Sequence, residues 1–131
     1  MKLWILRWGP AVIVIGMIFV ASSMPGSDLP NLGHIDYLVK KGGHLLGYAL
    51  LGAAFLHALG GPGPTRRAGL AKAALLVILY AFLDEWHQRF TPGRAPSLVD
   101  VGIDTVGGLI GIAFFRLMSG RFQKRKLERK P

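Results

Sequence analysis

One run of ionisable side chains lies between two apolar segments, and its residue types are those that proteins use for proton transfer and ion binding. The run covers residues 84–94 and contains Asp84, Glu85, His87, Gln88 and Arg94. It is followed by Asp100 and Asp104. Carboxylates and imidazoles act as general acids and bases or as metal ligands. Because ionisable residues beside membrane segments are costly unless they pair, contact water or perform a function, this run is the first candidate site.

Four apolar stretches make up most of the chain, which is 51% hydrophobic and only 18% charged. A membrane-spanning helix needs roughly 20 residues, so these stretches predict helices near residues 8–24, 42–61, 68–88 and 97–117. A soluble protein of 131 residues would have too little polar surface to cover four such runs. We therefore expect a single all-α domain over residues 1–131, an integral membrane bundle of four transmembrane helices with a basic tail at 118–131.

The distribution of basic residues predicts the orientation of the chain in the membrane. If both termini are cytoplasmic, most of the 16 Lys and Arg residues fall in cytoplasmic segments, in agreement with the positive-inside rule. The net charge of +9 comes largely from the C-terminal tail, which we expect to contact anionic lipid headgroups rather than nucleic acid. Small residues at 21–23 leave a cleaved signal peptide as an alternative for the first segment, but we favour an uncleaved helix.

Four crossings place the start of the second helix, the end of the third and the start of the fourth on one outer side. The helical period puts Asp84, His87 and Gln88 on one face of the third helix. Glu85 points elsewhere, and it can pair with Arg89 four residues later. The polar side chains of three helix ends are therefore expected to converge.

Glycine pairs predict close helix contacts near the same polar residues. On the fourth helix, Gly107 and Gly111 share a face with the two aspartates. Gly43 and Gly47 form a second pair of the same spacing on the second helix. Such small-residue pairs let a neighbouring helix backbone approach closely in a membrane.

The converging residues divide into two sets by the chemistry that they could support. Candidates for acid–base catalysis are Asp84, His87, Asp100 and Asp104. Candidates for substrate binding are Lys41, His44, Tyr48, Glu85, Gln88 and Arg94. An ion-pair network that only holds the helices together accounts for the same residues, because buried charges need partners in any case.

A metal site is a weaker alternative at the level of sequence. His44, His87 and an aspartate offer suitable donors. However, the chain has no cysteine and no HExxH motif, so thiolate sites and the zinc-protease pattern are excluded. We expect no bound metal and no other cofactor.

The polar run and its surroundings resemble the VanZ-like family of small bacterial membrane proteins. The matching residues are Ser22, Ser23, Pro25, Lys41, His44, Tyr48, Asp84, Glu85, His87, Gln88, Phe90, Pro92, Gly93, Arg94, Asp100, Asp104, Gly107 and Gly111. The resemblance implies a multi-helix protein of the bacterial cytoplasmic (inner) membrane, and the family's namesake is associated with reduced susceptibility to teicoplanin. Many members carry Asn where this chain has Asp104, so this chain adds a potential negative charge at that position.

Three classes of function remain open. The first is a binding protein that holds or shields a lipid-linked cell-wall component, or the acyl chain of a lipoglycopeptide, with Lys41 and Arg94 contacting its anionic group. The second is a membrane-embedded enzyme acting on a lipid-linked substrate through the acidic residues and His87. The third is a small transporter, which would need to assemble as a homo-oligomer because the charges lie at one end only. We favour the binding protein.

Overall fold

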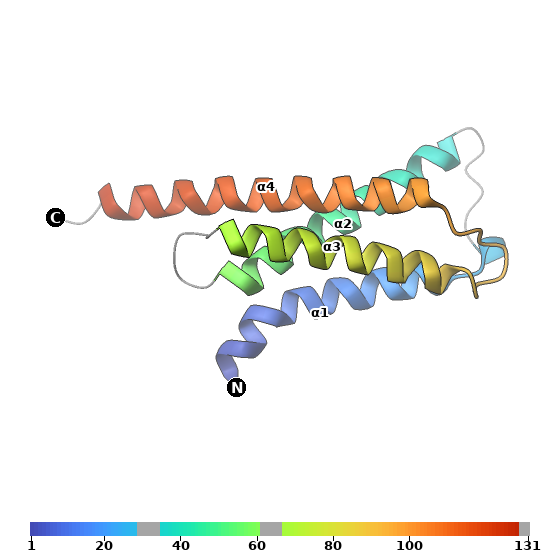
Figure 1. Ribbon diagram of the computed structural model, residues 1–131, viewed down its shortest axis with the longest axis horizontal. Helices are drawn as coiled ribbons and strands as arrows, with labels where there is room; N and C mark the ends of the chain where they lie inside the picture. The colour runs from blue at the N-terminus through green and yellow to red at the C-terminus, as the bar shows by residue number, and fades with distance from the viewer. Residues whose placement is uncertain (29–34, 61–66, 129–131) are drawn as a thin grey trace.

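The computed structural model describes residues 1–28, 35–60 and 67–128, and within them the fold is entirely helical (Figure 1). The long helices are α1 (Lys2–Ser23), α2 (Asp36–Gly60), α3 (Arg67–Gln88) and α4 (Leu98–Glu128), with a short 3₁₀ turn, η1 (Gly26–Asp28), after α1. The predicted all-α bundle of four helices is therefore confirmed.

Within the described part of the chain, three helices have the length and hydropathy needed to cross a membrane, over Lys2–Ser23, Leu38–Gly60 and Leu98–Arg121. The fourth, α3, has 22 residues and is long enough to span, but polar residues at both of its ends lower its hydropathy. It contacts each of the other three helices. A helix that packs against protein on several sides needs fewer lipid-facing apolar residues, so the lower hydropathy of α3 agrees with its place in the bundle.

Helix boundaries differ from those expected, because hydropathy locates a membrane span rather than a helix. The first helix begins at Lys2 instead of near residue 8, and α2 begins at Asp36 instead of near residue 42. The helix α4 continues to Glu128, through much of the segment expected to be a tail. Lys, Arg and Leu are good helix formers, so charge at the edge of a span does not end the helix.

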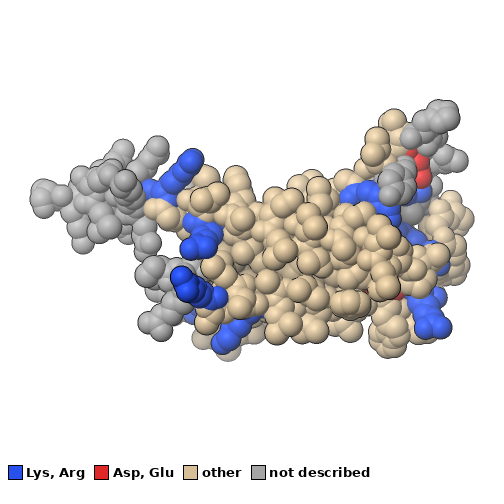
Figure 2. Space-filling view, turned by 45° about the horizontal axis from the view of Figure 1, so that its top comes forward, with Lys and Arg blue, Asp and Glu red and all other residues tan. Residues whose placement is uncertain are grey.

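The charged side chains of the described residues gather at the two ends of the bundle. In Figure 2, Lys and Arg side chains gather at both ends, and a band without visible charges lies between them. The start of α1 and the end of α4 lie at the same end of the bundle, apart from each other (Figure 1). The opposite end contains the end of α1, the start of α2, the end of α3 and the start of α4, and we call it the carboxylate end. An apolar band between charged ends is the pattern expected for a membrane protein.

The tightest helix contact joins α2 to α4. A side chain at Gly107 would overlap the Leu45 carbonyl, and one at Gly111 would overlap the Ala49 carbonyl. The predicted close approach at this glycine pair is confirmed, with α2 as the partner. On α2, however, the expected pair is wrong, because a Cβ at Gly43 would have no neighbour within 4 Å. It is Gly52 that contacts the α4 backbone.

A second contact holds the connection between α3 and α4 against the end of α1. The Gly26 amide donates to the Pro92 carbonyl over 3.0 Å. Gly93 has a φ of 72°, a left-handed conformation that favours glycine. A turn closed by the Arg94 amide on the Thr91 carbonyl (3.1 Å) then places Arg94 beside the last turn of α1.

Candidate functional site

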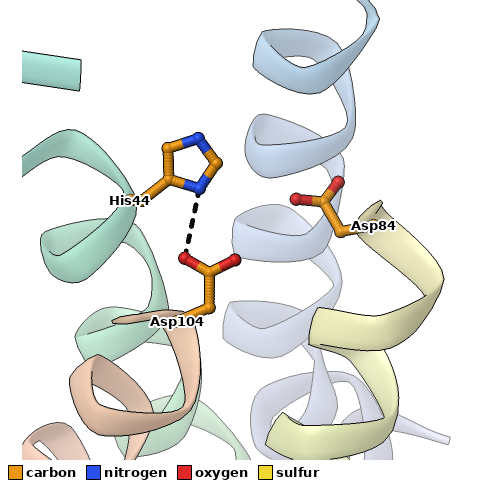
Figure 3. Close-up of side chains that lie close together, drawn as sticks. All are labelled: His44, Asp84 and Asp104. Atoms are coloured by element: carbon orange, nitrogen blue, oxygen red, sulfur yellow. Dashed lines mark hydrogen bonds and ion pairs between the residues drawn. The ribbon is translucent and has the colours of Figure 1, made fainter. Parts of the chain in front are cut away.

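Three side chains from three helices meet inside the carboxylate end (Figure 3). They are His44 of α2, Asp84 of α3 and Asp104 of α4, and we call them the His44–Asp84–Asp104 cluster. His44 Nδ1 is hydrogen-bonded to Asp104 Oδ1 over 3.1 Å. One potential ligand atom from each residue lies within 4.8 Å of the others. The predicted convergence of helix ends thus brings together one imidazole and two carboxylates.

Both carboxylates of the cluster are buried. Asp84 is 3% exposed and Asp104 is fully buried. The amide of Gln88 donates to Asp84 Oδ2 over 3.3 Å. Asp104 Oδ2 has no hydrogen-bond partner among the described residues, and the Tyr48 hydroxyl, which is 1% exposed, lies near both aspartates. Unsatisfied polar atoms at such depth are rare in folded proteins, which makes this cluster the first candidate for a functional site.

An ion pair lies beyond the cluster, toward the tip of the carboxylate end. Lys41 of α2 pairs with Asp100 of α4, and both side chains are partly buried. This contact neutralises a lysine that we expected to bind substrate and an aspartate that we expected to act in catalysis. Its position supports a role in holding α2 to α4 beside the cluster.

His87 faces α1 and lies outside the cluster. Its Nε2 is 3.0 Å from the Ser23 hydroxyl, and its ring packs on Phe19 with centroids 4.6 Å apart. The structure therefore does not assemble the metal-ligand set of His44, His87 and an aspartate that the sequence suggests.

Glu85 stabilises the start of α4. Its buried carboxylate accepts a hydrogen bond from the Ser97 amide over 2.7 Å, and the Ser97 hydroxyl caps α4 by accepting from the Val99 amide. The expected pair between Glu85 and Arg89 is wrong, since Glu85 is buried whereas Arg89 is exposed and pairs with no acid in the described part of the chain. Helical spacing allowed the pair, but burial turned Glu85 toward the neighbouring helix.

Arg94 binds the end of α1. Its guanidinium donates to the Ala21 carbonyl over 3.0 Å and to the Met24 carbonyl over 3.3 Å. These carbonyls are among those that a helix C-terminus leaves without intrahelical partners. No carboxylate of the described residues lies within 4 Å of Arg94, so its positive charge is held in place without being neutralised by an acid.

A cleft of about 260 Å³ opens between α1 and α2 next to this arginine. Its walls are mainly apolar, and its polar lining includes the side chains of Lys40, His44 and Arg94. Because His44 belongs to the cluster, the cleft reaches the cluster, and Tyr48 lines the cleft as well. The lining residues are Ile18, Ala21, Ser22, Met24, Val39, Lys40, Gly43, His44, Gly47, Tyr48 and Arg94.

Two serines of α1 and a threonine belong to the polar region, although none of the three was among the site residues expected from the sequence. Ser22 accepts from the Gln88 amide over 3.4 Å and also lines the cleft. Thr91 donates to the Ser22 carbonyl over 3.3 Å. The small polar pair that ends an otherwise apolar helix, Ser22 and Ser23, was the sequence feature that could have located this contact.

The arrangement therefore combines an apolar cleft, a fixed cation and a buried acidic cluster at one end of a membrane bundle. No curated protein and no solved structure matches the chain. A family model described as VanZ/LLP1 matches residues 8–119, which include every residue of the cluster, the cleft and the Arg94 contact. That match covers most of the sequence, and we conclude that the chain belongs to the VanZ/LLP1 family.

Proposed function

We propose that this protein binds an anionic amphiphile at the outer leaflet of the bacterial cytoplasmic membrane, in the cleft between α1 and α2. The ligand class is a lipid-linked cell-wall component or the acylated part of a lipoglycopeptide such as teicoplanin. The observation that carries the proposal is the combination of an apolar cleft with Arg94 at its edge. Ligand sites are typically concave and mostly apolar, with a few polar groups that orient the ligand.

The cleft suits an acyl or isoprenyl chain. Ile18 and Val39 contribute apolar wall, and Gly43 leaves space that a side chain would occupy. The helix α1 is packed loosely, since only 6% of its spanning window is buried in the bundle. A chain could therefore enter sideways from the lipid, without crossing the polar end.

Arg94 suits a phosphate or carboxylate headgroup. Two backbone carbonyls hold its guanidinium, so little side-chain entropy is lost when an anion binds. Guanidinium groups also donate several hydrogen bonds in a geometry that matches such anions. Lys41 was the other expected anion ligand, but its pairing with Asp100 makes it the weaker candidate.

The expected orientation of the chain in the membrane supports a site at the outer leaflet. With both termini in the cytoplasm, as the basic residues predict, the carboxylate end faces outward. Lipid-linked cell-wall components and glycopeptides are met at that leaflet. A link to teicoplanin resistance is part of the proposal and follows from the acyl chain that such a ligand would insert.

Filling the cleft tests the proposal directly. Gly43→Phe places a ring in the open space of the cleft, whereas Gly42→Phe changes the adjacent helical glycine, which also has open space but does not line the cleft. Both variants and the wild type are placed in nanodiscs and titrated with a fluorescent polyisoprenyl phosphate and with teicoplanin. We expect Gly43→Phe to weaken binding at least roughly tenfold and Gly42→Phe to leave it unchanged.

A survival assay tests the link to resistance. A susceptible host expresses each protein at matched membrane levels and is exposed to teicoplanin, with a glycopeptide that lacks an acyl chain as the ligand control. Protection by wild type and by Gly42→Phe, but not by Gly43→Phe, supports the proposal. In the nanodisc titration, equal ligand binding by wild type, Gly43→Phe and Gly42→Phe would contradict the proposal.

An enzyme acting on the same amphiphile is the second candidate, because His44 belongs both to the cleft and to the acidic cluster. Incubation of the nanodisc samples with the labelled lipid, followed by chromatography, separates the two candidates. A product that forms with wild type and not with Asp84→Asn would favour the enzyme. The cleft and the cluster lie at one end of the bundle, so no described feature favours transport across the membrane.

A further inference from the structure

We propose that the His44–Asp84–Asp104 cluster binds a divalent transition-metal cation. The sequence led us to expect no metal, and the ligand set that it suggested included His87 in place of one carboxylate. The structure instead assembles one imidazole nitrogen and two carboxylate oxygens from α2, α3 and α4. This proposal stands on that geometry and does not depend on the amphiphile site.

The ligand atoms are close enough to share one ion. They lie within 4.8 Å of one another. Neighbouring ligands of a tetrahedral zinc ion are roughly 3.4 Å apart, since the bonds to nitrogen and oxygen are about 2.1 Å long. Figure 3 shows the Asp84 and Asp104 carboxylates on either side of a common space beside the His44 ring. Rotation of the aspartate side chains would draw the three groups onto one ion.

Charge balance favours a cation at this point. Asp84 and Asp104 are buried, and their only basic neighbour within the cluster is His44, whose ring can carry at most one positive charge. Lys41 of the same helix as His44 forms its ion pair with Asp100. Buried carboxylates are strongly destabilising unless they are paired or coordinate a metal, and a divalent ion neutralises both.

A second, independent observation is a buried carboxylate oxygen that lacks a hydrogen-bond partner. Asp104 is fully buried, and its Oδ2 has no hydrogen-bond partner among the described residues although its Oδ1 is bonded to His44. Figure 3 shows this second oxygen directed toward Asp84. The buried Tyr48 hydroxyl lies near the same two aspartates. A bound ion would satisfy the second oxygen of Asp104.

The donor set and the surroundings define the class of ion. One imidazole with two carboxylates is a nitrogen–oxygen set that suits Zn²⁺ or Mn²⁺, whereas Mg²⁺ and Ca²⁺ prefer oxygen alone. Gln88 donates to Asp84 from outside the set, as the hydrogen-bonded neighbours of metal ligands commonly do. Since His44 and Tyr48 line the cleft, an ion and its exchangeable water have a route from the surface.

Metal content of the purified full-length chain tests the proposal. Protein in detergent is stripped with EDTA, incubated with ZnCl₂, MnCl₂ or MgCl₂, desalted and measured by inductively coupled plasma mass spectrometry. We expect about one Zn²⁺ or Mn²⁺ per wild-type chain, little Mg²⁺, and a higher thermal unfolding midpoint when Zn²⁺ is present. Asp84→Asn and Asp104→Asn should lower affinity by at least about tenfold.

The matched control is Glu85→Gln, an equally conservative change of another buried acid on α3 that lies outside the cluster. It should retain the metal. Wild type that binds no Zn²⁺ or Mn²⁺, or metal that persists in both aspartate variants and so is adventitious, would overturn the proposal. If Asp104→Asn does not fold, the Zn²⁺-dependent change in unfolding midpoint of wild type against Asp84→Asn decides the question. Failure here would leave the Gly43→Phe binding result unchanged, so the two proposals fail separately.

Discussion

The two sides of α2 are built differently. Toward α4, glycines bring the helix backbones into direct contact at Gly107, Gly111 and Gly52. Toward α1, the contact is loose enough to leave a cleft, and a side chain at Gly43 would meet nothing within 4 Å. The same residue type therefore serves close packing on one side and open space on the other. A rigid α2–α4 pair can position the buried cluster, while the α1 side keeps room for a ligand.

The largest effect is expected from a substitution in the close contact between α2 and α4. Gly111→Leu forces a side chain into the Ala49 carbonyl, and backbone atoms cannot move aside as a side-chain tip can. We expect a loss of about 3 kcal/mol or more in stability, or failure to fold, since overpacking alone typically costs about 1–3 kcal/mol. Thermal unfolding in detergent measures it. Gly102→Leu, on the same helix with open space, is the control, and equal losses in both variants would argue against a specific α2–α4 contact.

A smaller effect is expected at the ion pair that joins the same two helices. Lys41→Met leaves the partly buried Asp100 without its partner, and we expect a loss of roughly 1–2 kcal/mol, less than for a fully buried pair. The double variant Lys41→Met with Asp100→Leu should recover part of that loss, because no unpaired charge remains. Additive losses in unfolding experiments would show that the two residues do not interact.

At the cleft between α1 and α2, Arg94→Gln distinguishes a structural role of Arg94 from a role in ligand binding. It removes the hydrogen bonds to Ala21 and Met24, and we expect a modest loss of about 1 kcal/mol in stability. Binding of the labelled polyisoprenyl phosphate should fall at least roughly tenfold, and Arg94→Lys should restore it in part because the charge returns. If Arg94→Gln binds as well as wild type, Arg94 serves only to hold α1.

The smallest effect is expected at the contact between α1 and His87. Ser23→Ala removes two exposed hydrogen bonds, to the His87 ring and to the Phe19 carbonyl, and should cost about 0.5 kcal/mol or less. Metal content should not change, because His87 lies outside the cluster. A loss of Zn²⁺ from this variant would mean that His87 reaches the cluster and that the two sides of the bundle are less separate than described.

Helix class and the meeting of helix ends could be predicted because they depend on local quantities. Hydropathy and a 3.6-residue period place Asp84 and Gln88 on one face of α3, and the structure buries both. His87 lies near the edge of that face and contacts α1, since the facing neighbour depends on how the helix is rotated in the bundle. Likewise, spacing marked Gly43 and Gly107 as equivalent, although only one of them has a backbone opposite it.

The sequence by itself determined the helical class, the apolar segments and the gathering of polar residues at one end, because hydropathy and helical period are properties of the chain alone. Only the tertiary structure decided which residues became partners. It joined Lys41 to Asp100 and turned Glu85 toward Ser97. It also set Arg94 on the end of α1 and placed His44 beside Asp84 and Asp104. These pairings depend on helix rotation and on backbone distance, and both are set by packing between segments that are distant in sequence.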